Sequence, residues 1–209
     1  NPETIAAFVA EPIGGASGVV VAPENYFPEV ENLLTKYDIM LWSDEVICGF
    51  GRTGSPFGCQ TMGFNPQLVS LAKQLSSAYL PISASVIPEY MHEAMIEPSS
   101  KVGVFGHGYT YTGHPAACAA ALKTLEIYKR DDLFEHAAEM GEYLQTRLKE
   151  FDSHPLVGEV RGRGLLAAVE LVANKHSGEA FNDTSVGAYA KQACQDNGLL
   201  IRAVGGNSI

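Results

Sequence analysis

The chain has 209 residues, of which 46% are hydrophobic, and this is enough for one large core or for two modest domains. Fourteen basic and 24 acidic side chains give a formal net charge of −10. Such a chain repels phosphate backbones, so the composition argues against nucleic-acid binding and favours a solvated acidic surface.

The first 90 residues alternate short apolar runs with a helical pattern. Residues 5–10 predict a buried strand, and Pro23 and Glu24 open a helix with apolar residues on one face (Phe27, Val30, Leu33, Leu34 and Tyr37). Residues 39–42 predict the next strand. This strand–helix–strand order indicates an α/β fold with a mostly parallel sheet covered by helices. Residues 68–71 and 82–87 predict two more strands, the second turned back against the first.

The pattern is different in the second half of the chain. Pro115 begins an alanine-rich helix that we expect to run to about Tyr128, and Asp131 and Asp132 can cap a second helix to about Phe151. From residue 157 onward we expect a short strand pair around 165–171, a loop at 175–183, a helix to about 196 and a last strand at 199–201. This change predicts a smaller second domain that begins between residues 130 and 155.

Cysteine usage and hydropathy suggest an intracellular protein. The four cysteines are too scattered for a disulfide framework or a zinc site, so we expect reduced thiols in the core and no bound metal (Cys48, Cys59, Cys118 and Cys194). No apolar run approaches the ~20 residues that span a bilayer, and no signal peptide is evident. We therefore expect a cytoplasmic protein.

Both ends of the chain resemble cuts through a sheet. The chain opens at Asn1 without a methionine and enters the apolar run 5–10 almost at once. It stops at Ile209, soon after the apolar run 199–201. We expect this sequence to be a fragment of a longer protein.

Lys73 is the lysine with the most unusual surroundings. It directly follows the apolar run 68–72, whereas the other lysines lie in polar or helical contexts. A lysine at the carboxyl end of a buried strand loses hydration, which favours the neutral, nucleophilic amine. This edge of a parallel sheet is also where α/β folds bind ligands. The alternative is a structural lysine that extends its ammonium group from a sheet edge into water.

Asp44 ends the preceding predicted strand in the same way. If the two strands are neighbours, Asp44 and Lys73 lie on one edge of the sheet. An acid that keeps a pyridinium nitrogen protonated and a lysine that forms a Schiff base are the minimum equipment for pyridoxal phosphate. The alternative is that Asp44 only caps the turn that follows it.

Three segments resemble motifs of one enzyme family. Residues 43–54 (SDEVICGFGRTG) strongly resemble the D-E-V-x-x-G-F-G-R-T-G signature of class III aminotransferases. Residues 72–82 (AKQLSSAYLPI) are similar to that family's cofactor-lysine segment, and residues 105–115 (FGHGYTYTGHP) are similar to its phosphate-binding loop. Residues 10–13 (AEPI) fit a fourth motif. The motifs occur in the family's order, and the resemblance covers the whole chain.

The resemblance implies roles for four of these residues toward pyridoxal phosphate. Asp44 would pair with the pyridine nitrogen, and Val46 would lie against one face of the ring. Lys73 would hold the cofactor covalently and later carry a proton to and from the substrate Cα. Thr110 would donate to the cofactor phosphate of the partner subunit, so that a homodimer shares its active sites. The alternative for Thr110 is a loop threonine that satisfies its own turn.

Two further residues are candidates for substrate binding. Arg202 resembles a mobile arginine of the amine:pyruvate subgroup, which binds the carboxylate of an amino or keto acid; a planar guanidinium suits that task. A structural ion pair is the alternative for Arg202. Glu11 resembles a glutamate near the cofactor in related enzymes. Two departures from the family pattern are Gln74, where a glycine is common, and Ser43, where an alanine is common.

The resemblance also implies the architecture and the reaction. Residues 1–130 would be the C-terminal portion of the large cofactor-binding domain of a fold-type I enzyme, and residues 131–209 part of its small α+β domain. The full enzyme would be a transaminase that moves an amino group from an amine or ω-amino acid to a keto acid such as pyruvate. The alternatives are a decarboxylase or aminomutase of the same family, or an inactive truncated chain.

Overall fold

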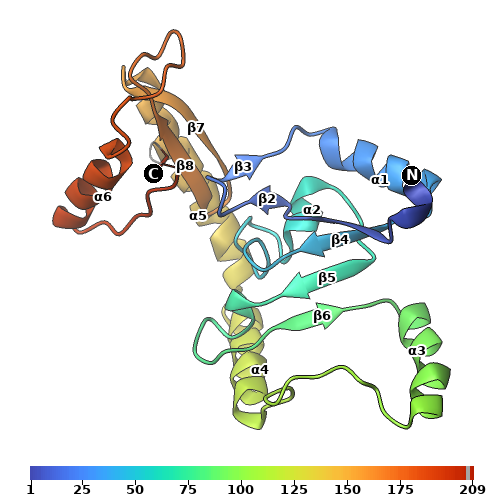
Figure 1. The fold of residues 1–209 in the computed structure, drawn as a ribbon. Helices are drawn as coiled ribbons and strands as arrows, with labels where there is room; N and C mark the ends of the chain where they lie inside the picture. Colours follow the sequence, from blue (N-terminus) through green and yellow to red (C-terminus); the bar gives the residue numbers. More distant parts are fainter. Residues whose placement is uncertain (206–207) are drawn as a thin grey trace.

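The computed structural model describes residues 1–205 and 208–209 as an α/β protein (Figure 1). Its strands and helices run in the following order: η1 Pro2–Thr4, β1 Ala7–Ala10, β2 Ile13–Gly14, β3 Val20–Val21, α1 Tyr26–Lys36, β4 Met40–Asp44, α2 Gly58–Met62, β5 Leu68–Leu71, η2 Lys73–Leu75, β6 Ala84–Val86, α3 Glu89–Val102, α4 Pro115–Arg130, α5 Leu133–Leu148, η3 Lys149–Ser153, β7 Val157–Arg163, β8 Leu166–Leu171 and α6 Val186–Asp196.

A four-stranded sheet in the order β1-β4-β5-β6 occupies the centre of the first half. β1 pairs in parallel with β4, and β4 pairs in parallel with β5. β6 runs antiparallel to β5 and is the outermost strand on that side of the sheet. The predicted α/β class, the mostly parallel sheet and the strand that turns back are therefore confirmed.

One face of this sheet is covered by a compact apolar core. Leu41 of β4 packs with side chains from α1, α2 and the segment that leads to β5 (Phe27, Leu34, Cys59 and Phe64). Phe27 and Phe64 stack with ring centroids 4.2 Å apart. Burial of such side chains stabilises the fold by roughly 1.5–3 kcal/mol each. The helix predicted after Pro23 and Glu24 therefore forms and packs through Phe27, Val30 and Leu34. Leu33 and Tyr37, which were predicted on the same face, are exposed.

The alanine-rich helix α4 begins at Pro115, as predicted, and ends with Lys129 and Arg130. Proline is favourable in the first turn of a helix, and basic residues are favourable in the last. Asp132 precedes α5, but it has a φ of 49° and its side chain makes no capping hydrogen bond. The predicted aspartate cap is therefore wrong, and the other candidate, Asp131, instead pairs with Arg130.

The C-terminal part contains the antiparallel hairpin β7–β8 and the helix α6. The hairpin meets the first half where Gly141 of α5, Gly164 of the hairpin turn and Thr53 lie against each other. A Cβ added to Gly141 would lie 2.5 Å from Gly164 Cα, and one added to Gly164 would lie 2.5 Å from the Thr53 carbonyl carbon. Only glycine permits so close an approach.

The strand predicted at 199–201 does not form. Residues 199–203 have no regular structure, and the last described segment instead makes isolated bridges through Ser208 to Glu170 and Val204. The run Leu199-Leu200-Ile201 is apolar, but Leu199 and Leu200 are exposed. Among the described residues no strand lies beside this run, and an apolar run forms a strand only when it can pair with a neighbour.

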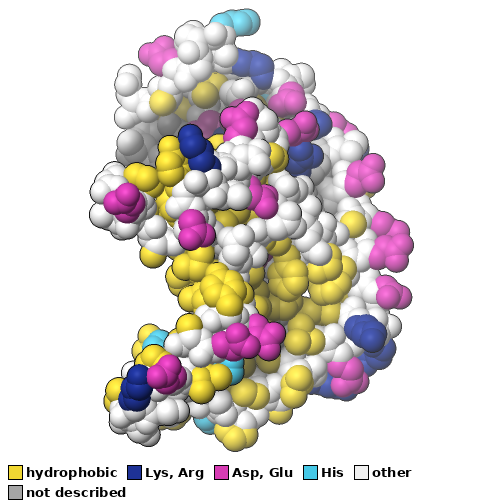
Figure 2. Space-filling view, turned by 90° about the vertical axis from the view of Figure 1, so that its right-hand side faces the viewer, with side chains coloured by type: hydrophobic (Ala, Val, Ile, Leu, Met, Phe, Trp, Pro, Cys, Tyr) yellow, Lys and Arg dark blue, Asp and Glu magenta, His cyan; other side chains and the backbone are white. Residues whose placement is uncertain are grey.

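Large apolar side chains are exposed along the segment from η2 to the start of α4. They include Tyr79, which is 82% exposed, and several others (Val86, Ile87, Tyr90, Ile96, Val102, Val104, Phe105, Tyr109 and Tyr111). Figure 2 shows apolar side chains gathered in a recess on one face of the molecule. No helix within residues 1–205 and 208–209 has the length and apolar character needed to cross a membrane.

Candidate active site

Three candidate residues lie at the carboxyl ends of neighbouring parallel strands. Asp44 is the last residue of β4 and lies opposite Ser70 of β5, and Lys73 follows β5. Glu11 directly follows β1, whose last residue is paired with Ser43 of β4. The side-by-side strands proposed from the sequence therefore place Glu11, Asp44 and Lys73 at one edge of the sheet, where α/β folds bind ligands.

The Asp44 carboxylate is held by the turn that follows it. Its Oδ1 accepts a hydrogen bond from the Val46 backbone amide at 3.0 Å. No described residue donates to its second oxygen, so this oxygen can accept from a ligand. The same contact holds Val46, which is half-buried. Asp44 thus caps the turn, which was its alternative role, and still keeps one oxygen open.

Lys73 opens the turn η2 in an uncommon backbone conformation. Its φ is +45°, and Ser77 and Ala78 also have positive φ, of 49° and 60°. Lys73 is exposed and has no ion pair within the described residues. The burial expected from the sequence is therefore not provided by this part of the chain, because the strand ends before the lysine. A hollow of about 290 Å³ lies beside it, lined by Lys73, Ser76, Ala78, Leu80, Pro81 and Ile82.

Glu11 contributes to the turn that follows β1. Its Oε2 accepts a hydrogen bond from the Gly15 backbone amide at 3.0 Å. Glu11 is half-buried, and no described residue donates to its other oxygen. The structure therefore places Glu11 near the candidate site and gives it a local structural contact.

Thr110 and Arg202 come from irregular segments outside the sheet. Thr110 is exposed in the loop between α3 and α4, in a turn where the Tyr109 amide donates to Thr112 Oγ1. Arg202 is exposed in the irregular segment after α6. Neither residue has a described hydrogen bond or ion pair to Asp44, Lys73 or Glu11. Their proposed roles remain predictions.

Glu45 is a structural residue that the sequence reasoning missed. Its side chain is completely buried and accepts hydrogen bonds from the amides of Gly58 and Cys59, both at 2.7 Å, and from Ser43 Oγ at 3.1 Å. It thereby fixes the strand end that carries Asp44 against α2. Burial, together with the Glu45 charge, raises the pKa of the Cys48 and Cys59 thiols to about 12. The only sequence feature that pointed to Glu45 was its place next to Asp44 in the motif of residues 43–54.

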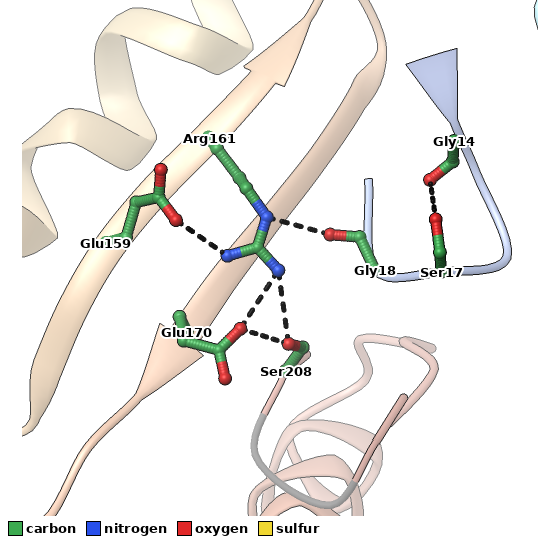
Figure 3. Close-up of polar contacts among 7 residues, drawn as sticks. All are labelled: Gly14, Ser17, Gly18, Glu159, Arg161, Glu170 and Ser208. Atoms are coloured by element: carbon green, nitrogen blue, oxygen red, sulfur yellow. Dashed lines mark hydrogen bonds and ion pairs between the residues drawn. The ribbon is translucent and has the colours of Figure 1, made fainter. Parts of the chain in front are cut away.

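Arg161 forms a second polar cluster, in the C-terminal part (Figure 3). Its guanidinium donates to the Gly18 carbonyl at 2.9 Å, to Glu170 at 2.9 Å and to Ser208 Oγ at 3.2 Å. It also pairs with Glu159 at 3.0 Å. One side chain therefore joins the β2–β3 turn, the β7–β8 hairpin and the end of the chain, and no local sequence pattern indicates this.

Comparison with known proteins agrees with this geometry. The model of the class-III aminotransferases matches residues 1–209. Putrescine–pyruvate aminotransferase of Pseudomonas aeruginosa is 47% identical over 208 residues, which are 99% of this chain and 45% of that protein. Gamma aminobutyrate transaminase 3, chloroplastic, of Solanum lycopersicum is 46% identical over 99% of this chain and 40% of its own length.

Solved structures agree as well. The omega transaminase of Pseudomonas jessenii in complex with PMP superposes with a TM-score of 0.96 and 46% identity, over 100% of this chain and 47% of the other. This chain thus spans less than half the length of each of these relatives. The fold, the strand-end residues and the match over all 209 residues agree, and the chain belongs to the class-III aminotransferase family.

Proposed function

We propose that the protein to which this chain belongs is a transaminase that moves an amino group from a primary amine or ω-amino acid to a keto acid such as pyruvate. The observation that carries this proposal is the placement of Asp44 and Lys73 at the ends of adjacent parallel strands. The relative named putrescine–pyruvate aminotransferase supports an amine donor and pyruvate as acceptor.

The residues at this edge of the sheet fit pyridoxal phosphate, the cofactor of the family. Asp44 keeps one carboxylate oxygen without a partner in the described chain, and Lys73 has no ion pair there. A hollow of about 290 Å³ adjoins the lysine. An open acid and an accessible amine at neighbouring strand ends are the two side chains that this cofactor requires around its ring.

When bound, the cofactor supplies an electron sink for the bond that breaks at the substrate Cα. Asp44 would hold a proton on the pyridine nitrogen through its open oxygen, which keeps the ring cationic. Val46, held by the same carboxylate, would limit the room on one face of the ring. The Lys73 amine would bind the cofactor between turnovers and move a proton to and from the substrate Cα.

We also propose the expected domain division, with residues 1–130 in the large domain and 131–209 in the small one. A homodimer with shared active sites is part of the proposal, because the segment from 79 to 111 exposes many large apolar side chains. Thr110, on the exposed loop of that segment, would then donate to the phosphate bound by the partner. A cytoplasmic location remains a prediction.

For Arg202 we propose a role in carboxylate binding, with Glu11 near the cofactor as a second substrate contact. Arg202 is exposed and has no described ion pair, so the structure offers no support for the structural alternative. Replacement of Arg202 by alanine should weaken the use of the keto acid far more than the use of an uncharged amine. Equal losses for both substrates would contradict this role.

The decisive experiment uses the full-length protein. Incubation with an amine donor and pyruvate in the presence of pyridoxal phosphate should yield alanine and the matching carbonyl product in equal amounts. Release of CO₂ or an isomerised amino acid would instead indicate a decarboxylase or an aminomutase. Lys73→Ala should abolish both the turnover and the visible absorbance of lysine-bound cofactor. A Lys73→Ala variant with unchanged absorbance would refute the assignment.

A further inference from the structure

Gln74, the residue directly after Lys73, is tied to the segment that follows Asp44. The guanidinium of Arg52 faces the Gln74 side-chain amide and donates to its oxygen from Nε at 2.8 Å and also from Nη2. A guanidinium only donates hydrogen bonds, and this decides which end of the amide faces it. The ends of two neighbouring strands are therefore joined by a side-chain contact.

The same residue is also anchored to helix α4. The Gln74 backbone carbonyl accepts a hydrogen bond from the Tyr128 hydroxyl at 2.8 Å. That hydroxyl lies 2.6 Å from Ser77 Oγ, near the end of the turn formed by residues 73–78, which we call the lysine turn. The turn that begins at Lys73 is thus held on both sides, by Arg52 and by Tyr128.

Arg52 is itself well placed to act as an anchor. Its backbone carbonyl accepts from the Leu165 amide at 2.9 Å, which fixes it to the β7–β8 hairpin. The neighbouring Thr53 is packed against Gly164 of the same hairpin. Arg52 is therefore held at both its backbone and its guanidinium, and movement at one end is resisted by the other.

The lysine turn needs such anchors because its backbone is strained. Lys73, Ser77 and Ala78 are non-glycine residues with φ between +45° and +60°. This conformation is unfavourable for residues with a side chain, and it persists only when its surroundings enforce it. Within the described chain, the contacts with Arg52 and Tyr128 are the side-chain hydrogen bonds that join this turn to segments distant in the sequence, and Ser76 Oγ adds a local one to the Leu80 carbonyl.

We propose that Gln74 is a positioning residue: through Arg52 and Tyr128 it holds Lys73 in the conformation that presents its amine to the cofactor. This inference rests on the proposed function. It assigns a task to the position where the sequence departs from the glycine common in the family, since a glycine has no side chain for Arg52 to hold.

The test compares variants of the full-length enzyme loaded with pyridoxal phosphate. Gln74→Leu keeps the size of the side chain and removes the acceptor, whereas Gln74→Glu keeps an acceptor for the Arg52 fork. Gln192→Leu is the matched control, because Gln192 also makes a side-chain hydrogen bond, to Asp196 at 2.8 Å, and lies on α6 away from the lysine turn.

Misplacement of a reacting amine lowers turnover more than binding, so Gln74→Leu should reduce kcat about tenfold while KM for the amine changes less than about twofold. The pH midpoint of the visible absorbance of lysine-bound cofactor should shift in Gln74→Leu and stay unchanged in Gln192→Leu. Gln74→Glu should restore kcat to within about threefold of the parent enzyme. Arg52→Ala and Gln74→Leu should not be additive, since they remove the same contact.

Three results would overturn the proposal: a parental kcat and pH midpoint in Gln74→Leu, the same midpoint shift in the control variant, or additive losses of kcat in the Arg52→Ala and Gln74→Leu double variant.

If Gln74→Leu does not fold, Tyr128→Phe provides the test, because it removes only the hydroxyl that holds the turn. A parental kcat and midpoint in Tyr128→Phe would then refute the proposal, and a shifted midpoint with lowered kcat would support it. A parent enzyme without cofactor absorbance would reject the proposed function itself; a normal parent with an unaffected Gln74→Leu rejects only this inference.

Discussion

The sheet edge around Asp44 and the joint around Arg161 are built in different ways. At the sheet edge, strand pairing places Asp44 and Lys73 at neighbouring strand ends, and contacts from Arg52 and Tyr128 then hold the turn that begins at Lys73. At the joint, a single half-buried arginine connects Gly18, Glu170 and Ser208, which lie up to 143 residues away in the sequence. Backbone pairing thus places the proposed chemistry, whereas one side chain joins the distant segments.

The largest effect should come from the sheet edge. Asp44→Asn retains an oxygen that can accept from the Val46 amide, so the turn and the folded state should survive. It removes the negative charge proposed to hold a proton on the cofactor ring, and kcat/KM should fall by about 100-fold or more. Steady-state kinetics at saturating cofactor, with a thermal melt as the folding control, would measure this. A loss below about tenfold would contradict the role of Asp44.

The next largest effect should be on stability, at the support beneath that edge. Glu45→Ala leaves the buried amides of Gly58 and Cys59 without acceptors, and should cost about 3 kcal/mol. The midpoint of urea unfolding would report this loss. Glu126→Ala, at an exposed surface pair, is the control and should change the midpoint little. Equal midpoints for the two variants would show that Glu45 is not a structural support.

A smaller and local effect should follow at the joint. Arg161→Ala should cost roughly 1–2 kcal/mol, because the Gly18 carbonyl loses the guanidinium donor and the Glu170 carboxylate keeps only Ser208 Oγ as a donor. Hydrogen exchange should speed up at the Val169 and Ile209 amides, which bond to each other's carbonyls. Arg161→Lys should not restore protection, since an ammonium cannot make the forked contacts. Unchanged exchange at these amides in Arg161→Ala would contradict the role of Arg161 in joining the three segments.

The smallest effect concerns the thiols behind the sheet edge. Burial raises the pKa of Cys48 and Cys59 to about 12, so both thiols remain protonated at neutral and mildly alkaline pH. Because the thiolate is the nucleophile, neither should react with a maleimide at pH 8 until the protein unfolds. Mass spectrometry of labelled peptides would check this. Labelling of Cys48 in the native enzyme at the rate of an exposed thiol would contradict the buried environment.

The amino-acid sequence predicted the α/β class, the parallel order of the first strands and the two long helices, because their apolar spacing and their proline and glycine positions are local signals. It did not predict α3, which contains Pro98 and buries no residue in the described chain. The last predicted strand failed because an apolar run pairs only where a neighbouring strand is available.

By itself, the sequence determined that an acid and a lysine stand at or just after the ends of two buried strands. The tertiary structure decided that these strands are neighbours, so that the two residues share one edge of the sheet. Only the tertiary structure decided that Gln74 meets Arg52, that Glu45 is buried beneath α2 and that Arg161 joins three distant segments. Strand ends follow from periodicity within a few residues, whereas these contacts depend on how separate elements pack, and no local spacing encodes that packing.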